Sequence, residues 1–125
     1  MINGFQNETA PLTDRELSVL PEAVAVLKTA YGKDKAVYND RLQRITGLSS
    51  ARIRKLINHI RSNDLVPCLM ASSKGYYIAE TEEEILDYEE SLRGRELAIR
   101  NIRHKIAEQR AARFSKPKPV QMSLF

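Results

Sequence analysis

The sequence predicts a mainly α-helical protein with one small β-hairpin, a long C-terminal helix and an extended tail. Three observations predict this fold class. Apolar residues recur at helical spacing over most of the chain. Two short apolar segments flank the loop 72–75, which has Gly near its end, as in a hairpin. Residues 81–113 then form one unbroken helical pattern with acids in its first turn.

The first predicted helix follows a polar leader. Thr13 or Asp14 is expected to cap it, with Glu16 in the first turn. Proline is best tolerated at the first position of a helix, so we expect Pro21 to begin a second helix over residues 21–31.

A short strand is predicted over residues 36–38, and two further helices follow it. Asn39 is expected to cap the helix 40–46, and Gly47 suits the left-handed position after its last turn. Leu48 is expected to be buried in the turn. Ser49 or Ser50 then caps a helix that runs to about residue 62, with a clean apolar face made of Ile53, Leu56, Ile57 and Ile60.

The predicted hairpin has strands at 65–71 and 76–80. Tyr76 and Tyr77 alternate across a strand, so one is expected to fill the core and the other to be exposed. Cys68 lies within the first predicted strand, where a packed small side chain is expected.

The long helix begins with a Thr81 cap, and Gly94 weakens its middle by about 1 kcal/mol. Apolar residues at alternating spacings of three and four form a seam, in which Arg95 and Gln109 take two positions. The seam either packs on the first helix or pairs with a second copy, and we expect a homodimer. The expected dimerisation residues are Ile85, Tyr88, Leu92, Ile99, Ile102 and Ile106.

The chain is therefore expected to contain four segments, each defined by its pattern. They are a flexible leader (1–12), a compact domain (13–80), the long helix (81–114) and a disordered tail (115–125).

Composition excludes several protein classes. No apolar run approaches the roughly 18–20 residues of a membrane span, and the N-terminus lacks the pattern of a secretory signal. A single cysteine cannot form an internal disulfide and indicates a reducing compartment, so we expect a cytoplasmic protein. Two histidines and one cysteine, far apart, do not fit a structural zinc site. We expect no catalytic residues, cofactor or metal, and therefore no enzyme.

The net charge of +4 conceals three blocks. Residues 41–61 contain six basic residues and no acidic one. Residues 80–90 contain seven acidic residues and no basic one, and residues 93–118 contain nine basic and two acidic residues. Such asymmetry indicates local electrostatic roles, although a charged block is often only a solvated surface.

The order of helix, strand, helix, tight turn, helix and hairpin is that of a winged helix-turn-helix, which indicates double-stranded DNA as partner. Side chains at the start of the second helix of the pair would contact the edges of the DNA bases. Flanking arginine and lysine residues would neutralise phosphates. The alternative is a protein-binding module with a solvated basic face. The expected DNA-binding residues are Arg41, Arg44, Ser50, Ala51, Arg52, Arg54, Lys55, Asn58, His59, Arg61, Ser73 and Lys74.

The segment GLSSARIRKLINHIRSNDLVPCLMASSKGYYIAE resembles the winged-helix module at the N-terminus of biotin-operon repressors. It is also similar to small phage and mobile-element proteins in which the helix-turn-helix is followed by P-I-x-S-S-x-x-G-Y-Y. The resemblance covers about residues 17–84, and residues 75–77 are its most specific part. It implies DNA binding. The catalytic ligase domain of the biotin repressors has no counterpart here, so no enzymatic role is implied.

The chain ends in a pentapeptide that resembles the bacterial sliding-clamp-binding motif Q-x-[S/D]-L-F. Such a peptide binds extended, with an apolar pair in a preformed pocket and a glutamine hydrogen-bonded at the other end. A basic, proline-containing spacer precedes it. The alternative is that its last two residues fold back onto the domain. The expected clamp-binding residues are Gln121, Met122, Ser123, Leu124 and Phe125.

Together these features predict a DNA-binding replication accessory of a phage or mobile element that docks on the sliding clamp. Two alternatives remain open. One is a transcriptional regulator with an incidental tail. The other is a clamp-binding adaptor or inhibitor whose winged helix binds protein.

Overall fold

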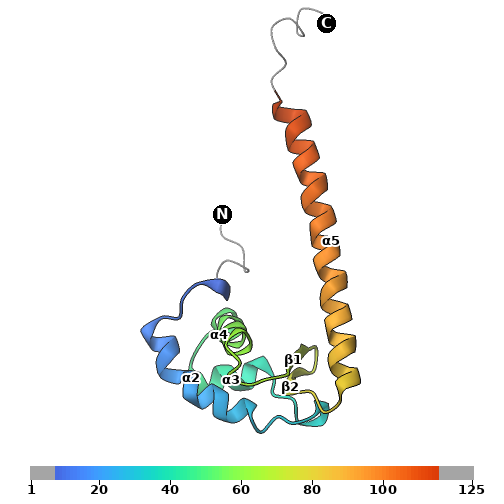
Figure 1. Cartoon of the computed structure of the whole chain (residues 1–125). Coiled ribbons are helices and arrows are strands. Elements are labelled where there is room, and N and C mark those ends of the chain that lie inside the picture. The colour runs from blue at the N-terminus through green and yellow to red at the C-terminus, as the bar shows by residue number, and fades with distance from the viewer. Residues whose placement is uncertain (1–7, 116–125) are drawn as a thin grey trace, which may run out of the picture. The chain divides into compact units, whose positions relative to one another are not determined.

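The computed structural model describes residues 8–115, and it is mainly α-helical with one antiparallel hairpin and a long C-terminal helix, as predicted (Figure 1). The chain divides into two compact units, and the boundary lies between Leu86 and Asp87, six residues after the expected one. The elements in chain order are α2 (Asp14–Leu27), the 3-10 turn η1 (Lys33–Lys35), α3 (Asn39–Thr46), α4 (Ser50–Ser62), β1 (Leu69–Ser72), β2 (Gly75–Ile78) and α5 (Glu82–Phe114).

Helix α2 begins as predicted and then continues through its proline. The Thr13 hydroxyl accepts from the Glu16 N–H (3.2 Å), and the Thr13 N–H donates to Glu16 Oε1 (2.8 Å), which completes a capping box. The expected new helix at Pro21 is wrong, because α2 passes through that residue and ends at Leu27. Pro21 is exposed, so water can satisfy the Leu17 carbonyl that loses its helical donor.

The core of the first unit lies between α2, α3, α4 and the hairpin. The predicted apolar face of α4 is confirmed, since all four of its residues are buried. Leu27 from α2 and Leu42 from α3 join them, together with Val37 and Val66 from the connections. Thirteen buried apolar residues form this single cluster, which fixes the orientation of α3 and α4.

The hairpin is shorter than predicted. Ser72 pairs with Gly75 across a two-residue turn, and Leu69 pairs with Ile78 at the other end. The expected strand at 36–38 is reduced to an isolated bridge, in which Val37 and Tyr76 exchange two backbone hydrogen bonds of 2.8 Å. A strand of that length did not form because η1 precedes it and α3 follows at once.

Two expectations about the hairpin side chains are wrong. Tyr76 and Tyr77 are both buried, because Tyr76 joins the core while Tyr77 is covered on the other face, where Lys33 Nζ lies 5.9 Å from its ring centre. Cys68 is exposed and precedes β1 in a turn, with a left-handed φ of 63°. It is not a packed strand residue.

Helix α5 starts with a second capping box, which confirms the Thr81 cap. The Thr81 hydroxyl accepts from the Glu84 N–H (3.1 Å), and Glu84 Oε1 accepts from the Thr81 N–H (3.2 Å). No residue of α5 is buried among the described residues. Most of its large apolar side chains face solvent, in contrast to those of α4.

Candidate nucleic-acid interface

The turn between α3 and α4 is fixed by short-range bonds. Gly47 ends α3 with a left-handed φ of 75°, as predicted, and Leu48 is buried. The Thr46 hydroxyl donates to the Leu42 carbonyl (2.7 Å) and accepts from the Leu48 N–H (3.2 Å). Arg15 on α2 donates to the Gly47 carbonyl (3.2 Å). The turn is thus preformed, and it holds the start of α4 in one orientation.

The start of α4 is exposed and basic. Ser49 caps the helix through the Arg52 N–H (3.4 Å), which confirms one of the two predicted caps. Arg54 donates to the Ser50 hydroxyl (2.9 Å), which keeps this guanidinium beside the helix N-terminus. Ala51, Arg52 and Arg54 are all exposed. Ala51 has a small side chain, so a partner can approach the start of the helix closely there.

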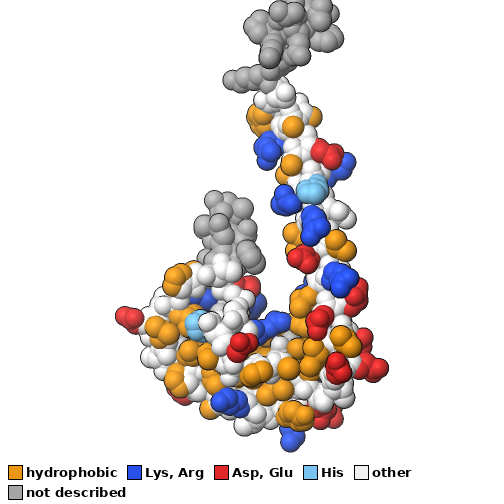
Figure 2. Space-filling view, viewed as in Figure 1, with side chains coloured by type: hydrophobic (Ala, Val, Ile, Leu, Met, Phe, Trp, Pro, Cys, Tyr) orange, Lys and Arg blue, Asp and Glu red, His pale blue; other side chains and the backbone are white. Residues whose placement is uncertain are grey.

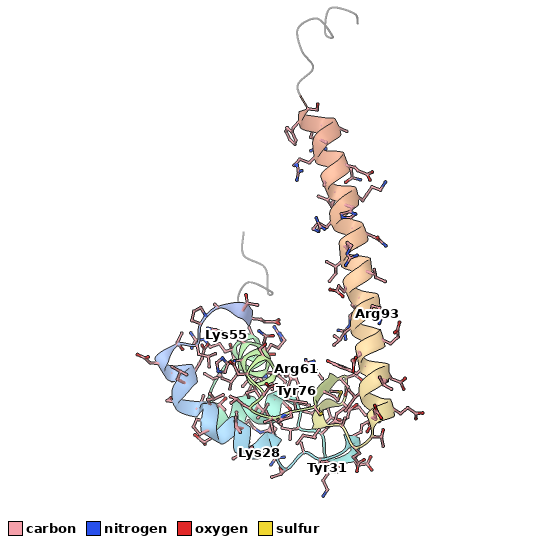
Figure 3. All side chains as sticks on the ribbon, viewed as in Figure 1. Lys28, Tyr31, Lys55, Arg61, Tyr76 and Arg93 are labelled. Carbon is pink, nitrogen blue, oxygen red and sulfur yellow. The ribbon has the colours of Figure 1, made fainter. Side chains whose placement is uncertain are left out.

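A buried ion pair lies beneath this exposed start. Glu16 on α2 is 1% exposed, and its Oε1 accepts from Lys55 Nζ at 2.7 Å. Lys55 comes from α4 and is labelled in Figure 3. Arg52 Nε lies 3.8 Å from Oε2 of the same carboxylate. Burial acts to raise the pKa of Glu16, but hydrogen bonds from the Lys55 ammonium and the Thr13 N–H outweigh it and lower the pKa from 4.5.

This pairing corrects the expectation for Lys55. Its side chain is only 12% exposed and binds Glu16, so it is not an outward-facing cation on α4. The helical wheel places Lys55 opposite the apolar face, but α2 packs on that side as well. Lys55 neutralises Glu16, and the nearby Arg52 guanidinium remains half exposed.

The second half of α4 is partly covered. Asn58 is half-buried and donates to the Glu8 carbonyl (3.0 Å), so the segment before α2 lies against this part of the helix. Asn63 donates to the His59 carbonyl (2.9 Å) and lies near its ring. Arg61 is also half-buried. Asn58, His59 and Arg61, which were expected to bind DNA, are therefore less exposed than the residues at the start of α4.

Helix α3 adds two exposed cations, because it packs against α4 and turns its polar side outward. Arg41 is exposed, and Arg44 makes only a solvent-exposed pair with Asp40 (3.5 Å). The expected Asn39 cap is wrong, since its side chain instead donates to the Tyr76 hydroxyl (3.1 Å) and accepts from Gln43 (2.8 Å). This network connects α3 to the hairpin.

The hairpin tip carries its predicted side chains on a rigid turn. Ser73 and Lys74 are both exposed. The Ser72 hydroxyl accepts from the Lys74 N–H (3.1 Å) and donates to the Gly75 carbonyl (3.2 Å). Gly75 has φ 105°, and a Cβ there would lie 2.6 Å from the Val37 carbonyl oxygen. Only glycine allows the strand to approach Val37 this closely.

Sequence reasoning missed three contributors to this surface. Glu16, Arg15 and Glu8 come from the N-terminal segment and α2, yet they contact α4 or the turn before it. The T-x-x-E pattern at residue 13 did indicate the cap. No local pattern indicates that the same carboxylate also pairs with Lys55, because that pairing depends on how α2 crosses α4.

The remaining predicted sites fall elsewhere. Of the expected dimerisation residues, Ile85 and Tyr88 are half-buried, and Leu92, Ile99, Ile102 and Ile106 are exposed on α5. Gln121, Met122, Ser123, Leu124 and Phe125 lie outside the described residues.

Within residues 8–115, no three His, Cys, Asp or Glu side chains gather as metal ligands would. Over the same residues, no helix combines the length and hydropathy needed to cross a membrane.

Comparisons of the chain with protein-family models, with curated proteins and with solved structures found no match.

Proposed function

We propose that the first unit is a winged helix-turn-helix that binds double-stranded DNA in a bacterial cytosol. The observation that carries this proposal is the exposed basic surface built by α3 and the start of α4. Arg41, Arg44, Arg52 and Arg54 are exposed there, and residues 41–61 contain no acid. Exposed arginines on a helix pair supply the positive charge that contacts with duplex phosphates require.

The buried pair supports the same proposal. Glu16 is the acid nearest to Arg52, and Lys55 already occupies its Oε1 at 2.7 Å. The carboxylate is thus neutralised from below, and the field at the outer surface stays positive. In this arrangement Lys55 holds the Glu16 carboxylate that lies 3.8 Å from Arg52 Nε, while Arg52 and Ala51 are the side chains that reach a base edge.

The test removes two exposed arginines that do not touch Glu16. Arg41→Ala with Arg54→Ala is expected to weaken binding of a mixed-sequence duplex about tenfold, because two phosphate contacts are lost. The matched control is Lys28→Ala with Lys35→Ala, which removes the same charge from exposed positions outside residues 41–61. Fluorescence anisotropy measures both. Equal weakening by the two double variants would contradict a localised DNA surface.

The C-terminal pentapeptide carries the second part of the proposal, in which the protein docks on a bacterial sliding clamp as a replication accessory of a phage or mobile element. The support is the sequence of residues 121–125 alone. Leu124→Ala with Phe125→Ala is expected to abolish binding to purified clamp in calorimetry, since both apolar anchors are lost. Met122→Ala, at the variable position of the motif, is the matched control and should bind within a few-fold of the intact chain.

The two measurements together decide between the alternatives. Duplex binding without clamp binding would favour a transcriptional regulator, which a reporter fused to its own promoter then tests. Clamp binding without duplex binding would favour an adaptor or inhibitor whose winged helix contacts protein.

A further inference from the structure

The exposed surface of α5 is the largest feature that the proposed function leaves unused. Ile99 and Ile102 are 67% and 63% exposed, and Leu92 and Ile106 are exposed on the same side of the helix. These four residues are spaced by seven, three and four positions, so they form one stripe along an α-helix. A stripe of this kind on an otherwise unburied helix marks a contact surface.

The charges on α5 are divided between its two ends. Residues 82–98 contain seven acids and two bases, whereas residues 99–114 contain five bases and one acid. Figure 2 shows red side chains gathered at the start of α5 and blue ones farther along it. A second copy of the same helix is therefore complementary when it runs in the opposite direction, and repulsive when it runs in the same direction.

We propose that α5 pairs with α5 of a second copy as an antiparallel two-helix coil. Of the registers that the heptad pattern allows, we choose the one in which Ile99 packs against Ile102 of the second copy on each side of the two-fold axis. This places the two most exposed isoleucines of the helix at the centre of the interface. The partner is a second copy of this chain, and the interface is isologous.

The charges beside the seam agree with this register. Glu96 lies next to Arg103 of the second copy, and Glu89 lies next to Arg110 of the second copy. Each of these four residues directly follows a seam residue in the sequence. Because the dimer has two-fold symmetry, each pair occurs twice. Within one helix Glu96 and Arg103 are seven residues apart, about 10 Å along the axis, and do not pair with each other.

The polar residues of the seam also favour the antiparallel direction. A parallel coil stacks Arg95 directly on Arg95 of the second copy, and it sets Lys105 beside Arg110. The antiparallel coil instead packs the aliphatic part of Arg95 on Ile106, with the guanidinium reaching solvent. The same arrangement sets Leu92 opposite Gln109.

The first test exchanges charges in the full-length chain. Glu96→Arg alone and Arg103→Glu alone each place like charges together, and each should raise the dimer dissociation constant about tenfold in sedimentation equilibrium. The double variant should restore the intact constant, and an equimolar mixture of the two single variants should form heterodimers. A parallel coil predicts no rescue, because Glu96 and Arg103 are not neighbours in it.

The second test measures direction by spin-label distances, in a Cys68→Ser background. Ala98→Cys and Ala112→Cys occupy the same heptad position two heptads apart, and both are exposed. An antiparallel coil separates the two labels at 98 by about 8 Å along the axis, and the two labels at 112 by about 35 Å. A parallel coil gives equal short distances at both positions.

The charge exchange lies outside the first unit, so it should not change the thermal unfolding of that unit, and the spin-label variants are compared with Cys68→Ser alone. Duplex binding by the Glu96→Arg variant separates this inference from the proposed function. A chain that stays monomeric at all accessible concentrations, or that gives equal distances at 98 and 112, overturns the antiparallel dimer and leaves the DNA surface unaffected.

Discussion

Helix α4 and helix α5 use the same residue types in opposite ways. The isoleucines of α4 are buried in the core of the first unit, whereas Ile99, Ile102 and Ile106 of α5 face solvent. The acid nearest to α4 is buried and neutralised, whereas the acids of α5 are exposed and form weak pairs such as Glu90–Arg93 (4.0 Å). The first unit buries its own apolar cluster. Helix α5 leaves large apolar side chains exposed among the described residues.

The largest expected effect contrasts one isoleucine from each helix. Ile53→Ala should lower the free energy of unfolding by about 3 kcal/mol, because Ile53 is fully buried and its removal leaves a cavity. Ile99→Ala should change the unfolding of the first unit by less than about 0.5 kcal/mol. Urea denaturation measures both. Similar losses for the two variants would mean that α5 packs on the core.

The second effect tests the buried ion pair. Lys55→Met should cost about 3 kcal/mol, because it leaves the Glu16 carboxylate buried without its ammonium partner. The neighbouring variant Arg54→Met removes an exposed cation and should cost less than about 0.5 kcal/mol. If the two substitutions are equally mild in denaturation, Lys55 is not the residue that neutralises Glu16.

The third effect compares two glycines. Gly75→Ala should destabilise the first unit by about 2 kcal/mol, because φ is 105° and the added methyl meets the Val37 carbonyl. Gly94→Ala on α5 meets nothing within 4 Å and should instead favour the helix by about 1 kcal/mol. Thermal melts followed by circular dichroism distinguish them. A neutral Gly75→Ala would show that the hairpin can move away from Val37.

The smallest effect is a pH dependence. The folded-state pKa of Glu16 lies below its ordinary value of 4.5, so the unfolded chain binds the proton more tightly. The ionised Glu16 carboxylate contributes its whole stabilisation above about pH 4.5. This stabilisation is lost as the pH falls through the folded-state pKa. Glu16→Gln should remove this part of the acid dependence of the unfolding midpoint, while Glu90→Gln on α5 should leave it unchanged.

The local elements were largely predictable, because their signals lie within a few residues of one another. The Thr81 cap, the Gly47 turn and the apolar face of α4 all follow from short-range patterns. The continuous helix through Pro21 was not predictable, since its cost depends on whether the freed carbonyl reaches water.

The candidate surface was predictable only in part. The exposed arginines of α3 and of the start of α4 followed from spacing and charge. The burial of Lys55 and Tyr77 did not, because each depends on residues far away in the chain, Glu16 and Lys33. Contacts between distant residues depend on the angle at which helices cross, and the spacing of apolar residues in the sequence does not give that angle.

The salt dependence of duplex binding tests the central claim most directly. Four exposed arginines on α3 and α4 predict a slope of about −3 to −4 when the logarithm of the binding constant is plotted against the logarithm of salt concentration. The Arg41→Ala, Arg54→Ala variant should lose about two units of that slope. Absence of duplex binding at low salt, or binding with a slope near zero that the variant shares, would contradict a DNA-binding surface on this helix pair.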